Sequence, residues 1–176
     1  MRVITGTARG CRLETLSGDA TRPTAERVKE GLFSAIQFDL PDRRVLDLFA
    51  GSGQLGIEAL SRGAACCVFV DKNPQAAEVI RRNLHAAKLA EKSQVAAVDA
   101  PTFLARTRDT FDVIFLDPPY AAELLPSCIE AAAAHLAPGG VMVCESDAHQ
   151  VLPETAGAFA PHRTYRYGRV HITVYR

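Results

Sequence analysis

Apolar and polar positions along the chain follow two different periods. From residue 45 onward, short runs that are apolar almost throughout are separated by longer segments in which apolar residues recur at helical spacing. The short runs predict strands at 45–49, 66–71, 93–99, 111–117 and 140–146, and the longer segments predict helices at 54–63, 73–89, 100–108 and 121–136. Strands that are apolar on both faces belong in a parallel sheet covered by helices. The pattern therefore predicts a Rossmann-like, doubly wound α/β fold.

The two ends of the chain have other patterns. Residues 2–16 hold two short alternating runs on either side of a glycine-containing turn at 6–10, which predicts a β-hairpin. Pro23 and Thr24 are typical of a helix start, and apolar residues at helical spacing follow them. The last residues alternate about Gly168, which predicts an antiparallel hairpin that brings the sheet to about seven strands. We expect one domain over residues 1–176, with 1–23 as an N-terminal extension.

Length and composition limit the class of protein. The chain has 176 residues, the usual length of one domain, and 48% of them are apolar. A chain of this size can bury a stable core without disulfide bonds or a structural metal ion. No apolar run is long enough to span a membrane. The five cysteines form no C-x-x-C pair, so neither disulfides nor zinc are expected, and Cys66, Cys67 and Cys144 are interpreted as small buried residues. We expect a cytoplasmic protein without membrane or metal partners.

The formal net charge is zero, but its distribution is uneven. Three arginines and no acidic residue precede Glu14, and four arginines and no acidic residue follow Glu154. The segment between carries all twenty acidic residues and a net charge of −7. Charge alone is equally compatible with ordinary solvated surface. If the two basic ends meet in the fold, they form a phosphate-binding surface that the overall charge conceals.

A glycine-rich turn follows the first predicted strand. Gly51, Gly53 and Gly56 satisfy G-x-G-x-x-G between a strand and a helix, where glycines let the backbone approach a ligand and helix N–H groups face it. Asp71 ends the second strand 18 residues after Gly53, where a carboxylate can accept hydrogen bonds from ribose hydroxyls. This context predicts a nucleotide-type site, for either NAD or S-adenosylmethionine.

Asp47, inside the first strand, discriminates between these cofactors. A carboxylate beside a pyrophosphate is unfavourable, whereas beside a sulfonium or an amino group it is attractive. Asp47 therefore favours S-adenosylmethionine, although it could instead cap N–H groups of the glycine turn with either cofactor. Asp99 ends the third strand and could accept a bond from an adenine amino group or serve as a helix N-cap.

The fourth strand ends in Asp117-Pro118-Pro119-Tyr120, at the edge where open α/β sheets bind ligands. The structural alternative is a Pro-Pro turn with the tyrosine packed nearby. An exocyclic amine is a poor nucleophile because its lone pair is delocalised into the ring. Asp117 and the Pro118 carbonyl could accept its two hydrogens, while Tyr120 stacks on the base and the prolines hold the carbonyls in place. The segment therefore predicts a site for methylating an amine.

With these motifs in view, the sequence resembles the class I S-adenosylmethionine-dependent N-methyltransferases, and within them the RsmD-type small-subunit ribosomal RNA guanine-N2 methyltransferases. The resemblance covers nearly the whole chain. It rests on VITGTARGCRL at the start, TRPTAERVKEGLFS, DLFAGSGQLGIEALSRGA, VDKN, DPPY, LAPGG and the closing YGRVHITVY. DPPY is shared with other amine methyltransferases, whereas the 21–33 segment with the N-terminal hairpin is more specific. Cys11 departs from the basic or polar residue often found there.

The resemblance implies roles for individual residues. The cofactor would be held by Asp47, Phe49, Ala50, Gly51, Ser52, Gly53, Asp71, Lys72, Asn73, Asp99 and Ala100, and the target amine by Asp117, Pro118, Pro119 and Tyr120. RNA would meet Arg9, Arg12, Arg22, Arg27, Tyr167 and Arg169. The partner implied is small-subunit ribosomal RNA within an assembled or partly assembled 30S particle, by analogy.

The sequence thus predicts an enzyme that methylates N2 of a guanine in small-subunit ribosomal RNA. Two enzyme alternatives keep the cofactor and change the acceptor to adenine N6 or a protein amide. A non-catalytic RNA-binding assembly factor of the same fold and a nicotinamide-dependent oxidoreductase are the remaining alternatives. The intact DPPY segment speaks against the former, and Asp47 against the latter.

Overall fold

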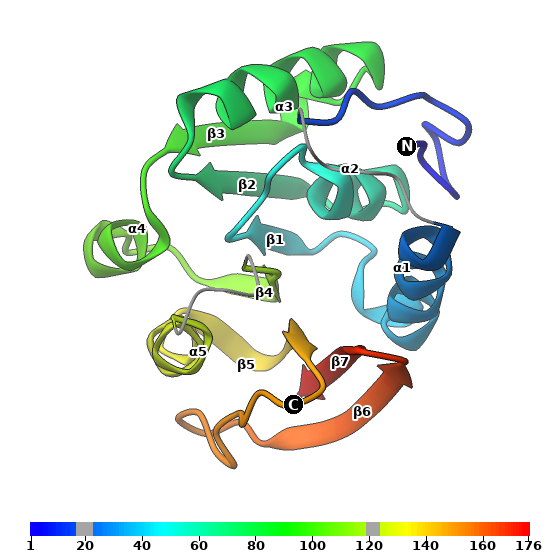
Figure 1. Ribbon diagram of the computed structural model, residues 1–176. Helices are drawn as coiled ribbons and strands as arrows, with labels where there is room; N and C mark the ends of the chain where they lie inside the picture. The colour runs from blue at the N-terminus through cyan, green and yellow to red at the C-terminus, as the bar shows by residue number, and fades with distance from the viewer. Residues whose placement is uncertain (17–22, 119–123) are drawn as a thin grey trace.

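A computed structural model describes residues 1–16, 23–118 and 124–176 of the chain (Figure 1). In this described part, seven strands form one sheet in the order β3-β2-β1-β4-β5-β7-β6. The strands are β1 (Arg44–Asp47), β2 (Cys66–Asp71), β3 (Ser93–Ala97), β4 (Phe111–Leu116), β5 (Leu136–Asp147), β6 (Pro161–Tyr167) and β7 (Val170–Tyr175). The first five pair in parallel, and β7 pairs antiparallel with both β5 and β6. The Rossmann-like prediction is confirmed, including its antiparallel C-terminal hairpin.

Five α-helices in the described ranges cover the two faces of the sheet. They are α1 (Pro23–Ala35), α2 (Gln54–Ser61), α3 (Pro74–Ala86), α4 (Ala100–Arg106) and α5 (Leu125–Ala133). Buried residues of α1, α2 and α3 share one apolar cluster, and those of α4 and α5 share another. Short 3₁₀ helices at Gln37–Asp39 (η1) and Ala90–Lys92 (η2) precede β1 and β3.

Each central strand contributes side chains to both apolar clusters, because successive side chains of a strand point to opposite faces of the sheet. On β4, Val113 and Phe115 belong to the α1–α3 side, while Ile114 and Leu116 belong to the α4–α5 side. This is why the strand runs read as apolar throughout. Strand β3 is only half-buried because it lies at the edge of the sheet.

The predicted N-terminal hairpin forms, but as one β-bridge, Arg2 to Arg12, rather than as two strands. Val3 N–H donates to the Cys11 carbonyl, and Gly10 N–H donates to the Val3 carbonyl, both at 2.9 Å. Between these bonds, the N–H groups of residues 4, 5, 7 and 8 donate to Glu58 and Ser61 of α2, whereas Arg9 N–H donates to the Gly6 carbonyl within the turn. Tertiary contacts therefore replace the strand ladder that alternation alone predicts.

The boundary between α5 and β5 also differs from the prediction. The predicted helix extends to residue 136, whereas α5 ends at Ala133 and β5 already begins at Leu136, which pairs with Phe111. A register shift between Phe111 and Val113 accommodates the glycine-containing start of β5. All five cysteines are free. Cys67 and Cys144 are buried as expected, whereas Cys66 is half-buried.

None of the described helices is both long and apolar enough to cross a bilayer. Within the same ranges, no three or more His, Cys, Asp or Glu side chains are grouped so that they could hold a metal ion.

Candidate functional site

The candidate site lies where the strand order reverses, between β1 and β4. After Asp47 the chain leaves β1 between its two neighbours. Leu48 N–H donates to the Phe115 carbonyl of β4 at 3.1 Å, and Ala50 N–H donates to the Val70 carbonyl of β2 at 2.9 Å. Open α/β sheets bind ligands at such a switch point, outside the carboxyl ends of the strands.

The glycine turn that follows has the backbone that the motif requires. Gly51 and Gly53 have φ of 55° and 80°, in the left-handed region that glycine adopts without strain. Apart from its own chain neighbours, no atom of the described residues lies within 4 Å of where a Cβ on Gly51 would be. At Gly56, by contrast, a Cβ would collide with Phe69 and the Cys67 sulfur. Gly51 therefore leaves open space beside the turn, and Gly56 lets α2 pack tightly on β2.

Asp47 is buried directly below this turn. Its Oδ2 accepts a hydrogen bond of 2.9 Å from Gly56 N–H, so the capping role that the sequence left open is realised by one carboxylate oxygen. Its Oδ1 has no hydrogen-bond partner in the described part of the chain. Burial raises the pKa of Asp47 to about 7, with the Gly56 N–H opposing and the Asp71 charge reinforcing the shift. A buried unpaired oxygen is costly unless a ligand supplies a donor or a positive charge.

Asp71, at the end of β2, organises the other side of the turn. Its Oδ2 accepts from Gly51 N–H at 2.9 Å and its Oδ1 accepts from Asn73 N–H at 2.8 Å. Each carboxylate oxygen can accept a second bond, so both remain able to receive a ligand hydroxyl. Asn73 is the N-cap of α3 and Lys72 is exposed.

Asp99 serves as the N-cap of α4, the alternative role that the sequence offered. Its side chain accepts from Thr102 N–H at 2.9 Å, and this bond lowers the pKa of Asp99. The carboxylate is exposed and Ala100 beside it is buried. Because Asp99 follows β3 at the same edge as Asp47 and Asp71, the adenine position remains open to it.

The DPPY segment starts at the expected place. Asp117 and Pro118 follow β4 directly, next to β1, with Asp117 half-buried and Pro118 buried. Pro119 and Tyr120 lie outside the described residues, so their predicted roles stay predictions. The structure thus brings Asp47, the glycine turn, Asp71, Asp99 and Asp117 to the carboxyl ends of four adjacent strands.

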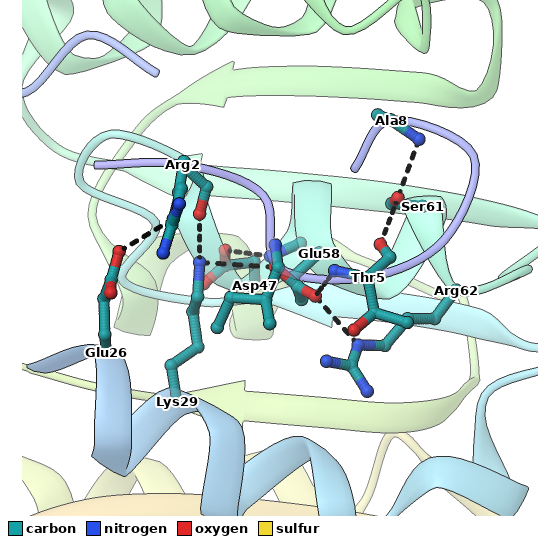
Figure 2. Close-up of polar contacts among 11 residues, drawn as sticks. Arg2, Thr5, Ala8, Glu26, Lys29, Asp47, Glu58, Ser61 and Arg62 are labelled. Carbon is teal, nitrogen blue, oxygen red and sulfur yellow. Dashed lines mark hydrogen bonds and ion pairs between the residues drawn. The ribbon is translucent and has the colours of Figure 1, made fainter. Parts of the chain in front are cut away.

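Sequence reasoning missed a buried polar cluster that anchors the N-terminal hairpin (Figure 2). Glu58 on α2 is fully buried. Its Oε2 accepts from Ile4 N–H at 2.8 Å and lies 3.3 Å from Lys29 Nζ, while its Oε1 accepts from Thr5 N–H at 3.0 Å and from Arg62 Nε at 2.9 Å. Burial lowers the pKa of Lys29, and Glu58 opposes that shift.

Three more hydrogen bonds strengthen this anchor. Lys29 Nζ donates to the Arg2 carbonyl at 2.8 Å, and the Ser61 hydroxyl accepts from Ala8 N–H at 2.9 Å while donating to the Thr5 carbonyl at 2.6 Å. The only signal in the sequence is a charged residue within an otherwise apolar helix, at Glu58. Its partners in the hairpin, Ile4 and Thr5, lie more than 50 residues away in the chain, which periodicity cannot reveal.

The arginines assigned to RNA occupy the surface around α1. Arg9 and Arg12 on the hairpin and Arg27 on α1 are exposed. Arg22 lies outside the described residues. Arg169 is exposed in the β6–β7 turn and forms an ion pair of 3.4 Å with Asp147. Tyr167 is half-buried against α1, where its hydroxyl leaves no room for a Cβ at Gly31. Helix α1 thus contacts both basic ends of the chain (Figure 1).

Comparison with known proteins assigns the chain to a family. A family model described as "Conserved hypothetical protein 95" matches residues 1–176, the whole chain. The chain belongs to this family.

Its relatives are named as methyltransferases. "Putative rRNA methyltransferase YlbH" of Bacillus subtilis (strain 168) is 41% identical over all of this chain and 98% of its own length. "Ribosomal RNA small subunit methyltransferase D" of Escherichia coli (strain K12) is 33% identical over all of this chain and 89% of its own. A solved structure titled "Putative methyltransferase yhhF from Escherichia coli" superposes with a TM-score of 0.87 at 32% identity, covering 99% of this chain and 96% of that one.

Proposed function

We propose that this protein transfers a methyl group from S-adenosylmethionine to the exocyclic N2 amine of a guanine in small-subunit ribosomal RNA. The observation that carries the proposal is the position of Asp117 and Pro118 directly after β4, beside a glycine turn whose buried Asp47 has an unpartnered oxygen. The names of the full-length relatives support the substrate class. Guanine N2 as the acceptor rests on the resemblance of the sequence to the RsmD-type enzymes.

The residues around the glycine turn suit this cofactor. Asp47 Oδ1 offers a buried negative charge for a sulfonium or an ammonium group, and the open space beside Gly51 admits the methionine part. Asp71 receives the ribose hydroxyls and Asp99 the adenine amine. The side chains and backbone near them complete the site, namely Phe49, Ala50, Ser52, Gly53, Lys72, Asn73 and Ala100. When bound, S-adenosylmethionine supplies an electrophilic methyl group.

The acceptor side activates a weak nucleophile by orientation. Asp117 and the Pro118 carbonyl accept hydrogen bonds from the two N–H groups of the amine. These bonds favour the pyramidal geometry that the nitrogen needs to attack the methyl group. Pro119 and Tyr120 continue the motif in sequence, with Tyr120 as the surface on which the base stacks. The guanine must leave its stack to reach this edge, which costs a few kcal/mol in a duplex and less in a loop.

The RNA side of the proposal uses the exposed arginines. Arg9, Arg12 and Arg27 lie on the hairpin and α1 without an acidic partner in the described ranges, and Arg169 lies in the β6–β7 turn. The small number of such residues suits a target presented by a large partner, which we infer to be an assembled or partly assembled 30S particle in the cytoplasm. Tyr167 belongs to the same proposed surface, and Arg22, outside the described residues, keeps the RNA-binding role that the resemblance implies.

The test is transfer of labelled methyl from S-adenosylmethionine to 30S particles taken from a strain that lacks the protein. Nucleotide analysis of the RNA is expected to find the label in N2-methylguanine. Free RNA, DNA and ribosomal protein are run in parallel. Label in N6-methyladenine or in a protein amide would assign the alternative acceptor, and absence of any transfer would refute the enzyme itself.

Cofactor affinity is expected to rise with pH through about 7, because a cationic ligand favours the ionised form of Asp47, whose pKa is about 7. Titration calorimetry of S-adenosylmethionine in buffers of different ionisation enthalpy should show proton release near pH 7. The Asp47→Asn variant keeps an acceptor for Gly56 N–H but should bind more weakly and without this proton release. Equal proton release in both proteins would contradict the role of Asp47.

The same group has a measurable effect on folding. Asp47 binds its proton up to about pH 7 in the folded state but only up to about 3.8 when unfolded. Between these values the unfolded state holds fewer protons, so this residue makes stability fall as pH rises. The cofactor-free wild type is therefore expected to lose stability from pH 5 to 7 relative to Asp47→Asn, as measured by urea denaturation.

Removing the two hairpin arginines is expected to weaken binding to the RNA-bearing particle while leaving cofactor affinity within about twofold. Each lost phosphate contact should reduce the slope of log affinity against log salt by about 0.7–0.9. The measurement compares Arg9→Ala/Arg12→Ala with wild type across a salt series. Arg108→Ala, an exposed arginine after α4, is the matched control. An unchanged slope in the double variant would exclude the hairpin from the RNA interface.

A further inference from the structure

The N-terminal hairpin and the glycine turn share one buried side chain. Asn83 on α3 is 1% exposed. Its Oδ1 accepts from Glu14 N–H at 2.8 Å, and its Nδ2 donates to the Glu14 carbonyl at 3.0 Å and to the Ser52 carbonyl at 2.9 Å. Both amide hydrogens are thereby used. The Asn83 side-chain amide therefore holds both Glu14, at the end of the hairpin segment, and Ser52, in the glycine turn.

This bridge joins parts of the molecule that are far apart in the chain. Glu14 is 69 residues from Asn83, and Ser52 is 31 residues from it. Because the amide is rigid and buried, it cannot keep all three bonds if Glu14 moves relative to Ser52. Losing a buried bond leaves a polar group unsatisfied, which costs more than an exposed contact does.

A second connection runs parallel to the first. Glu58 lies in α2, the helix that begins directly after Gly53, and it holds the N–H groups of Ile4 and Thr5. The hairpin is therefore attached at two places: through Ile4 and Thr5 to the helix that follows the glycine turn, and through Glu14 and Asn83 to Ser52 within the turn. The exposed Arg9 lies between these two attachments and Arg12 lies just before the second.

We propose that Asn83 is a positioning residue that couples the N-terminal hairpin to the cofactor loop, so that cofactor binding and the order of the hairpin reinforce each other. The inference rests on the proposed function, since it assigns the cofactor to the glycine turn and RNA to the hairpin. A coupling of this kind is reciprocal: a hairpin held by RNA tightens the cofactor site by the same factor by which the cofactor orders the hairpin.

The test measures hydrogen exchange in the full-length protein with and without S-adenosylhomocysteine, whose binding is verified by calorimetry. In the wild type, the amides of residues 1–14 are expected to exchange at least about fivefold more slowly with ligand. The amides of α5, on the opposite face, report the general stabilisation that any ligand gives. Protection of residues 1–14 that exceeds that of α5 supports the coupling.

Two variants separate coupling from simple packing. Asn83→Ser removes the bridge and is expected to abolish the extra protection of residues 1–14 while the glycine turn is still protected at saturating ligand. Its KM for S-adenosylmethionine should rise about fivefold with kcat little changed. Arg82→Ala removes only the exposed 2.9 Å ion pair between Arg82 and Glu14 and should behave as wild type.

The outcomes are distinct. If S-adenosylhomocysteine binds but residues 1–14 are protected no more than α5, the coupling is wrong and the cofactor assignment stands. The same holds if Asn83→Ser retains the extra protection. If the ligand does not bind the wild type, both the coupling and the proposed function fail. Should Asn83→Ser not fold, the wild-type comparison of residues 1–14 with α5 decides alone.

Discussion

Alanine in place of Glu58 is expected to lower the free energy of unfolding by about 3–5 kcal/mol, the usual cost of removing one partner from a buried ion pair. The change leaves the Lys29 ammonium buried without its carboxylate and removes the acceptor for Ile4 and Thr5 N–H. Arg62 also loses its partner, although it is less deeply buried. The N-terminal hairpin should become the first segment to unfold.

Urea denaturation of the variant and the wild type measures this loss. Glu78→Ala, an exposed glutamate on α3, is the matched control and should change stability by no more than about 0.5 kcal/mol. The double variant Lys29→Met/Glu58→Gln removes the buried ion pair and keeps an acceptor for one of the two hairpin N–H groups, so it should be more stable than Glu58→Ala but less stable than wild type. A loss below about 1 kcal/mol in Glu58→Ala would mean that the cluster is solvated in solution.

Asparagine in place of Asp117 is expected to reduce methyl transfer to the 30S particle by about 100-fold, since a misplacement of about 1 Å in a reacting group can cost that much. The amide would present a donor where the carboxylate accepts hydrogens, so the target amine would lose its orientation. Cofactor affinity should change little because the role proposed for Asp117 is to orient the acceptor amine. Single-turnover transfer of labelled methyl measures the effect.

Asp112→Asn provides the control for this substitution. Asp112 lies on the same strand β4 but at its opposite end, where it accepts from Arg44 N–H at 2.8 Å and pairs with Arg43. Its replacement should leave the transfer rate within about twofold of wild type. Transfer by Asp117→Asn at the wild-type rate would show that another group orients the amine.

The strands and the glycine turn could be predicted from the sequence because their signals are local. The apolar runs of β1 and β4 reflect burial on both faces, and Gly51 and Gly53 occupy left-handed positions that favour glycine. The positions of Asp47, Asp71 and Asp117 then follow from the rule that parallel strands end at one edge. These residues could be brought together without knowledge of any long-range contact.

The rest depends on contacts that have no local signal. Asp99 and Asp47 each had two compatible roles, and only the positions of Thr102 and Gly56 N–H show that both residues act as caps. The attachment of the hairpin to Glu58 and Asn83 uses backbone groups of the hairpin, which any residue supplies. The alternating apolar and polar pattern of residues 2–16 predicted two paired strands, because such a pattern contains no information about polar partners on distant helices.

Strand β6 forms an outer edge of the sheet, where a strand of a second copy of the protein could pair with it. An exposed edge strand is a template for pairing with a second chain, and proline or charge on it opposes such pairing. Strand β6 begins with Pro161 and carries exposed arginines at 163 and 166. Two such edges in register would set like charges side by side, so this border of the fold protects the protein against aggregation.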